Sequence, residues 1–195
     1  SSDVCSSDLV SFSDILPNIK QGTYDLGLSS MFDTVERRQL VDMVDYYTAG
    51  TQWAQRVGGP NVDPNNACGL VISVQTASYQ EEVDLVTRNK KCLASGREKI
   101  HILSYVNQSD SIEAVKLGHA DAVVADSPVT QYEVKGSAGK LEIKYPPYDE
   151  QYYGISIQKG NALGKALQLS IQSLLHHKTK KSFPPCANKE NLPNV

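Results

Sequence analysis

The amino-acid sequence predicts an α/β protein with two similar lobes, and three observations favour this fold. A helix-turn-strand unit occurs twice, at residues 19–30 (IKQGTYDLGLSS) and at residues 115–126 (VKLGHADAVVAD). Short apolar runs such as LGL and AVVA are typical of buried strands in a parallel sheet. Helices and strands alternate along the chain, which favours a sheet flanked by helices. Because the two units lie about half of the chain apart, we expect each lobe to contain its own sheet.

Both copies of the unit carry the same local signals in the same order. A Lys in the last helical turn is followed by Gly22 in the first copy and by Gly118 in the second. Glycine readily adopts the left-handed conformation that ends many helices. The apolar strands that follow end at equivalent positions, Ser30 and Asp126.

A helix start is predicted after each of three strands. Asp33 precedes Glu36 by three residues, as Ser78 precedes Glu81 after the apolar strand 70–74. This spacing is typical of a helix N-terminus. Ser127 and Pro128 form the third start, because proline is favoured in the first helical turn.

These helix starts indicate where a ligand would bind. In open α/β sheets, ligands bind outside the carboxyl ends of the strands. We therefore expect the functional site near Ser30, Ser78 and Asp126.

Two turn-rich segments are predicted to connect the lobes. They are residues 58–66 (GGPNVDPNN) and residues 145–148 (YPPY). Lobe 1 would then contain residues 10–61 and 146–177, and lobe 2 residues 62–145. A hinge with two crossings allows a cleft to close over a ligand.

The two ends of the chain do not fit this pattern. Residues 1–9 (SSDVCSSDL) match one translation frame of a common sequencing adaptor, and we expect them to be an artefact. We expect that the natural N-terminal segment, with its signal peptide, is missing. Residues 178–195 (KTKKSFPPCANKENLPNV) are interpreted as an aberrant tail.

Composition excludes several classes of protein. The net charge is −3 and the Lys and Arg residues are scattered, so we expect no nucleic-acid partner. No apolar run reaches the roughly 20 residues of a membrane-spanning helix. The adjacent His176 and His177 lack further ligands at a suitable spacing, so we predict neither a metal site nor a cofactor. We expect a monomer.

Four cysteines occur, two of them in the unusual ends of the chain. Cys5 and Cys186 lie in those ends, whereas Cys68 precedes a strand and Cys92 follows the next helix. A disulfide between Cys68 and Cys92 and two unpaired buried thiols are both compatible with these positions, because geometry rather than spacing decides.

Four segments resemble one known family. They are residues 24–53 (YDLGLSSMFDTVERRQLVDMVDYYTAGTQW), 68–82 (CGLVISVQTASYQEE), 118–132 (GHADAVVADSPVTQY) and 152–175 (YYGISIQKGNALGKALQLSIQSLL). Together they are similar to the family 3 solute-binding proteins of polar amino acid ABC importers, over about residues 12–177. The resemblance implies the periplasmic binding protein type II fold, and it favours the Cys68–Cys92 disulfide.

The resemblance also implies a clamp for an amino acid backbone. Arg37 occupies the position that grips the ligand α-carboxylate, for which a planar guanidinium is well suited. Asp126 occupies the position that accepts from the α-ammonium, and Ser30 contributes a main-chain carbonyl to the same group. From composition alone, a solvated charge on a short helix is the favoured interpretation of Arg37, and a helix cap is an alternative for Asp126; the resemblance favours ligand contact instead.

Four further positions are implied to contact the ligand. Ala77 and Ser78 lie in a turn whose N–H groups and hydroxyl meet the carboxylate at a helix N-terminus. Ser78 would cap its own helix in either case. Gln75 occupies a position that often reads the ligand side chain. Phe32 replaces the usual Thr or Ser, so one hydroxyl is lost while the backbone N–H remains.

The function implied is that of an extracytoplasmic binding protein, and not of an enzyme. It would capture an amino acid by closing its cleft and deliver it to the permease subunits of an ABC importer. Two alternatives share this fold: a cyclohexadienyl or arogenate dehydratase, and the sensor domain of a receptor.

Overall fold

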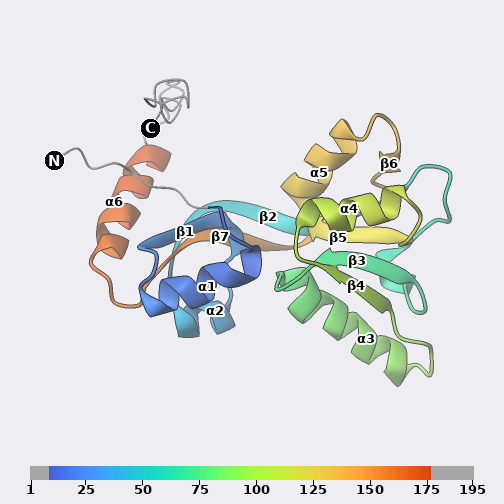
Figure 1. The fold of residues 1–195 in the computed structure, drawn as a ribbon, viewed down its shortest axis with the longest axis horizontal. Helices are drawn as coiled ribbons and strands as arrows, with labels where there is room; N and C mark the ends of the chain where they lie inside the picture. The colour runs from blue at the N-terminus through green and yellow to red at the C-terminus, as the bar shows by residue number, and fades with distance from the viewer. Residues whose placement is uncertain (1–8, 177–195) are drawn as a thin grey trace, which may run out of the picture.

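The structure is a computed structural model that describes residues 9–176, and its strands form one mixed sheet (Figure 1). The strand order is β1-β7-β2-β5-β3-β4, with β6 paired to β2. The strands are β1 (Leu26–Phe32), β2 (Asp42–Arg56), β3 (Val71–Gln75), β4 (His101–Tyr105), β5 (Ala122–Asp126), β6 (Leu141–Glu142) and β7 (Tyr148–Ile157). The helices are α1 (Phe12–Gln21), α2 (Val35–Leu40), α3 (Leu85–Ala94), α4 (Gln108–Lys116), α5 (Ser127–Gly136) and α6 (Leu163–His176), with a 3₁₀ turn at Pro64–Asn66 and a π-helical turn at Gln80–Asp84.

The molecule has the predicted two lobes, and each lobe has its own apolar core. Helices α1, α2 and α6 surround one end of the sheet, whereas α3, α4 and α5 surround the other (Figure 1). The main core of the second lobe contains Trp53, Ile72, Val74, Leu85, Ile100 and Val124. A core of the first lobe contains Ile15, Ile19, Met31, Val41 and Met43. The two-lobed α/β fold is therefore confirmed.

The long strand β2 belongs to both lobes. Its first part pairs with β7, from Asp42 opposite Ile157 to Thr51 opposite Tyr148. Its second part pairs with β5, beginning where Thr51 lies opposite Asp126. The lobes thus share one sheet instead of containing two separate sheets. The chain first passes between lobes near Thr51, before the turn at 58–66 in which the sequence placed this crossing.

A glycine permits close contact at this crossing. Gly50 directly precedes Thr51, and a Cβ atom at Gly50 would lie only 2.9 Å from the Tyr148 carbonyl oxygen. Because that oxygen belongs to the backbone of β7, a side chain could not be accommodated without moving a strand. The Gly50 N–H also donates to Ser127 Oγ at 3.2 Å, across to the second lobe.

The repeated helix-turn-strand unit is present as predicted, but its strands are paired differently. Helix α1 ends at Gly22 with φ of 77°, and Gly118 after α4 has φ of 81°. Strand β5 pairs parallel with β3. Strand β1 pairs antiparallel with β7, so the expectation of a parallel strand is wrong there. The local sequence signals correctly predicted where each strand lies, but they carried no information on which distant strand it pairs with.

One of the three predicted helix starts, the one at Ser78, has the expected capping chemistry. Ser78 Oγ accepts from the Glu81 N–H at 3.2 Å, and Glu81 Oε2 accepts from the Ala77 N–H at 2.7 Å. Pro128 lies in the first turn of α5, but the N-cap residue is Asp126 instead of Ser127, so this start is one residue earlier than predicted. The start at Asp33 is wrong by one residue, because Thr34 caps α2 and its Oγ1 accepts from the Arg37 N–H at 3.3 Å.

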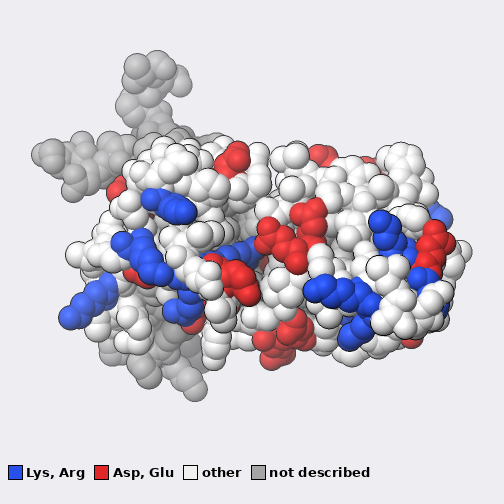
Figure 2. Space-filling view, turned by 90° about the horizontal axis from the view of Figure 1, so that it is seen from below, with Lys and Arg blue, Asp and Glu red and all other residues white. Residues whose placement is uncertain are grey.

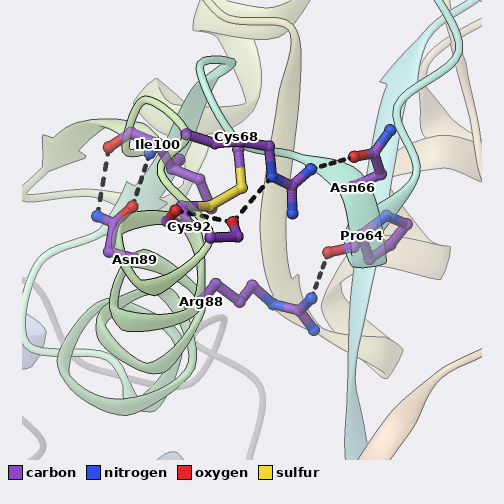
Figure 3. Close-up of a disulfide and its surroundings, with 9 residues drawn as sticks. Pro64, Asn66, Cys68, Arg88, Asn89, Cys92 and Ile100 are labelled. Carbon is purple, nitrogen blue, oxygen red and sulfur yellow. Dashed lines mark hydrogen bonds between the residues drawn. A yellow bond between two sulfur atoms is a disulfide. The ribbon is translucent and has the colours of Figure 1, made fainter.

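A disulfide joins Cys68 and Cys92, so the alternative of two unpaired thiols is wrong (Figure 3). The two Cα atoms lie 5.6 Å apart, and the bond ties the segment before β3 to helix α3. Asn89 on α3 accepts from the Ile100 N–H at 2.6 Å and donates to the Ile100 carbonyl at 3.3 Å. These contacts tie helix α3 to the segment before β4, close to the Cys92 end of the disulfide. Cys5 and Cys186 lie outside the described residues.

We expect this disulfide to contribute about 3 kcal/mol to the free energy of unfolding, because it closes a loop of 24 residues in the unfolded chain. Thermal unfolding followed by circular dichroism, with and without reductant, measures this contribution. The Cys68→Ala/Cys92→Ala variant should match the reduced protein and be insensitive to reductant. An unchanged melting temperature in reductant would contradict the prediction.

Candidate functional site

A cavity of about 290 Å³ lies at the junction of the two lobes. It is bounded by β1 and α2 of the first lobe and by the carboxyl ends of β3 and β5 in the second. Six of the seven predicted site residues line it, namely Ser30, Phe32, Arg37, Gln75, Ser78 and Asp126. The other lining residues are Phe12, Ser29, Tyr79, Gln80, Gln108, Ser109, Val129 and Glu133. Ala77 lies beside this cavity but does not line it.

Arg37 is the cation of the cavity, and its side chain connects the two lobes. Only 6% of the residue is exposed. Nη1 donates to the Phe32 carbonyl at 2.9 Å, and Nη2 donates to the Ala77 carbonyl at 3.1 Å. Burial lowers the pKa of Arg37, while the negative charges of Glu82 and Asp126 raise it. The interpretation as a solvated surface charge is therefore wrong, and the guanidinium keeps further N–H donors for an anion.

Asp126 is held in place by two hydrogen bonds. Its Oδ1 accepts from Gln80 Nε2 at 2.7 Å, and its Oδ2 accepts from the Tyr153 hydroxyl at 2.8 Å. Burial raises the pKa of Asp126 to about 6, against the opposite effects of these two hydrogen bonds and of Arg37. Although Asp126 occupies the N-cap position of α5, its side chain makes no capping hydrogen bond. Its carboxylate therefore belongs to the cavity and not to the helix start.

The two partners of Asp126 were not predicted from the sequence. Gln80 is 2% exposed and also donates to Thr51 Oγ1 at 3.1 Å. Its position just after the Ser78 helix start is the one local signal that could have indicated it. Tyr153 lies in the middle of β7, where an aromatic residue is ordinary. Only the pairing of β2 with both β5 and β7 brings these groups together.

Ser30 reaches the cavity because β1 is bulged. Between Gly27 and Met31 the strand contains two more residues than the facing segment of β7. Ser30 adopts a left-handed conformation with φ of 48°, and Ser29 and Ser30 both line the cavity. Bulges of this kind redirect side chains and backbone groups near functional sites.

Phe32 belongs to an aromatic group on the cavity wall. Its ring is stacked on Tyr153, with centroids 5.3 Å apart, and it meets Tyr79 edge-on at 5.5 Å. The Tyr79 hydroxyl donates to Asp149 Oδ2 at 2.6 Å, a contact between the lobes. Phe32 thus adds apolar surface to the cavity, while its carbonyl is already bonded to Arg37.

The turn at residues 75–78 has most of its polar groups bonded within the protein. Ala77 has φ of 60°, its N–H donates to Glu81, and its carbonyl accepts from Arg37. Ser78 Oγ caps the following helix, and Gln75 Nε2 donates to the Val106 carbonyl at 3.3 Å. The Ala77 N–H, which was predicted to meet a ligand carboxylate, is therefore occupied.

Two further features of the described residues are absences. Within residues 9–176, no cluster of three His, Cys, Asp or Glu side chains could hold a metal ion. Over the same residues, no helix combines the length and the apolar character needed to cross a membrane.

Comparison with curated proteins finds relatives that are binding proteins. The arginine-binding protein ArgT of Corynebacterium glutamicum is 38% identical over 165 residues, which cover 84% of this chain and 54% of the relative. The ABC transporter glutamine-binding protein GlnH of Bacillus subtilis is 24% identical over 163 residues, which cover 82% of this chain and 56% of the relative. The chain therefore spans about half the length of these relatives. Neither is named as an enzyme.

Comparison with solved structures supports the fold. An ancestral arginine-binding protein bound to arginine has a TM-score of 0.77 and 25% identity, over 87% of this chain and 74% of that one. The GluR0 ligand-binding core from Nostoc punctiforme, in complex with L-glutamate, has a TM-score of 0.72 and 23% identity. The match covers 88% of this chain and 77% of that one. The second likeness concerns the fold alone.

A family model matches residues 5–175, which is most of the chain. The two lobes, the cavity at their junction and the binding proteins among the relatives agree with this match. The chain belongs to the bacterial extracellular solute-binding proteins, family 3.

Proposed function

We propose that this protein binds an amino acid in the cavity between its lobes, with Arg37 holding the α-carboxylate and Asp126 the α-ammonium. One observation carries the proposal: two buried groups of opposite charge, one from each lobe, line the same cavity. A guanidinium can bind a carboxylate through two parallel hydrogen bonds. A carboxylate held by neutral donors, as Asp126 is, retains its charge for an ammonium group.

Other lining residues complete the proposed site. The bulge presents Ser30, whose carbonyl would accept from the ammonium group. Ser78 would lie at the carboxylate, near a helix N-terminus that favours anions. Ala77, whose N–H already donates to Glu81, would instead hold Arg37 in place through its carbonyl. Gln75 and Phe32 would contact the ligand side chain. Their amide and aromatic groups can respectively donate hydrogen bonds and add apolar contact.

Ligand binding would favour the closed arrangement of the lobes. Arg37 bonds Ala77, Tyr79 bonds Asp149 and Tyr153 bonds Asp126, so direct contacts already connect the lobes at the cavity. A ligand that contacts Arg37 and Asp126 together would bind the closed arrangement more tightly than the open one, and would therefore shift the population towards the closed arrangement. We propose that the protein acts outside the cytoplasm and delivers its ligand to an ABC importer. The family and the named relatives support this role.

We expect at least one amino acid to bind in isothermal titration calorimetry, and Arg37→Ala to weaken that binding about 100-fold or more, because an unpaired carboxylate would remain in a buried site. Arg38→Ala is the matched control. Arg38 neighbours Arg37 but pairs with Asp33 outside the cavity, so its loss should leave affinity nearly unchanged. Equal affinities for wild type and Arg37→Ala, or no binding of any amino acid, would refute the proposal.

Affinity should also fall in mild acid. The ligand ammonium requires ionised Asp126, whose pKa is about 6, so protonation below that pH competes with binding. From pH 7 to pH 5 the apparent Kd should rise about tenfold. The Asp126→Asn variant should bind weakly, and its Kd should no longer change between pH 7 and pH 5.

Asp45 provides the control for this pH effect. Its pKa is also raised to about 6, mainly by burial, but it lies outside the cavity. The Asp45→Asn variant should therefore show the same rise in Kd between pH 7 and pH 5 as the wild type. A pH-independent Kd in the wild type would contradict the assignment of Asp126.

A further inference from the structure

The charges that line the cavity do not balance the proposed amino acid clamp. Among the described lining residues, the charged ones are Arg37, Asp126 and Glu133. If Arg37 and Asp126 engage the two backbone charges of a zwitterionic ligand, Glu133 remains as one negative charge. Acidic groups gather over the junction of the lobes, with a basic group recessed beside them (Figure 2). The cavity therefore has a negative charge for which a zwitterion alone provides no partner.

Helix α5 places Glu133 at a defined distance from Asp126. Asp126 is the N-cap residue, and Glu133 lies seven residues further along the same helix. Seven residues correspond to two turns and to a rise of about 10 Å, so both side chains project from similar faces of α5. Val129, which also lines the cavity, lies between them on this face. The side chain of a ligand whose ammonium group is held at Asp126 would thus lie along the apolar surface of Val129 and end near Glu133.

The carboxylate of Glu133 is unoccupied in the part of the chain that the structure describes. Within residues 9–176, neither a hydrogen bond nor an ion pair engages it, whereas Glu113 and Glu142 pair with Lys116 and Lys144. Gln108 and Ser109, at the start of α4, line the cavity as well and carry oxygen atoms that accept hydrogen bonds. The cavity therefore offers these acceptors in addition to the negative charge of Glu133.

We propose that Glu133 determines specificity, and that the ligand is an amino acid with a long cationic side chain ending in a guanidinium or an ammonium group. The inference rests on the proposed function, because the clamp at Arg37 and Asp126 sets where the side chain begins. A long side chain is needed to span two turns of α5, and its methylene groups would lie along Val129. A neutral amide of similar length would leave the charge of Glu133 unpaired, and an acidic side chain would be repelled.

Calorimetric titration with L-arginine, L-lysine, L-glutamine and L-glutamate tests this inference. Wild-type protein should bind arginine or lysine at least about tenfold more tightly than glutamine. Glu133→Gln should weaken binding of the cationic ligand about tenfold, while binding of glutamine changes little. Glu133→Lys should shift the preference towards glutamate. Glu113→Gln is the matched control, since it removes a carboxylate outside the cavity and should leave all affinities unchanged.

The outcomes separate this inference from the function on which it rests. If amino acids bind but glutamine binds as tightly as arginine and lysine, or if Glu133→Gln retains wild-type affinity for the cationic ligand, the role of Glu133 is refuted while the clamp stands. If none of a full panel of amino acids binds, the proposed function itself fails. Circular dichroism melts of each variant establish that changes in affinity do not come from unfolding, since Glu133 is only partly buried on α5.

Discussion

The backbone pairing of β2 is the constraint on which the rest of the molecule depends. Because β2 pairs with β7 along its first part and with β5 along its second, one strand fixes the lobes side by side. Gly50 allows the close approach of β7 at the crossing, where a side chain would contact the Tyr148 carbonyl. Thr51 lies opposite both Tyr148 and Asp126. The cavity forms beside this position, so its walls come from both lobes.

The network around Asp126 follows directly from that pairing. Tyr153 comes from β7 and Gln80 from the turn before α3, and their donors meet the Asp126 carboxylate at 2.8 and 2.7 Å. These bonds hold a buried anion in one orientation, while burial raises its pKa to about 6. On the opposite side, Arg37 is held by carbonyls of both lobes. Two charged side chains that hydrogen bonds already hold in place would suit a zwitterion in the closed arrangement, because neither side chain needs to reorganise on binding.

The charge balance of the cavity would add a second level of recognition to the proposed clamp. Backbone recognition needs only one cation and one anion, and it would be common to all amino acids. Discrimination requires a group whose partner belongs to the ligand side chain, and leaving such a group unpaired disfavours the wrong ligand. Glu133 has the position for this function, and within residues 9–176 its carboxylate has no partner. Specificity would then depend on α5, the helix that begins at the backbone clamp.

The sequence by itself determined the local elements. Gly22 and Gly118 end helices at the predicted positions, because a left-handed residue is a local requirement. Ser78 caps its helix because its hydroxyl accepts from a nearby backbone N–H, which is also a local requirement. Sequence patterns placed Ser30 and Asp126 at strand ends, and family resemblance supplied the clamp role of Arg37. Only the tertiary structure decided that β1 is antiparallel, that the lobes meet within β2, and that Gln80, Tyr153 and Glu133 lie at the cavity. These features depend on which strands pair and which faces pack, and long-range contacts of this kind leave no periodic or capping signal in the chain.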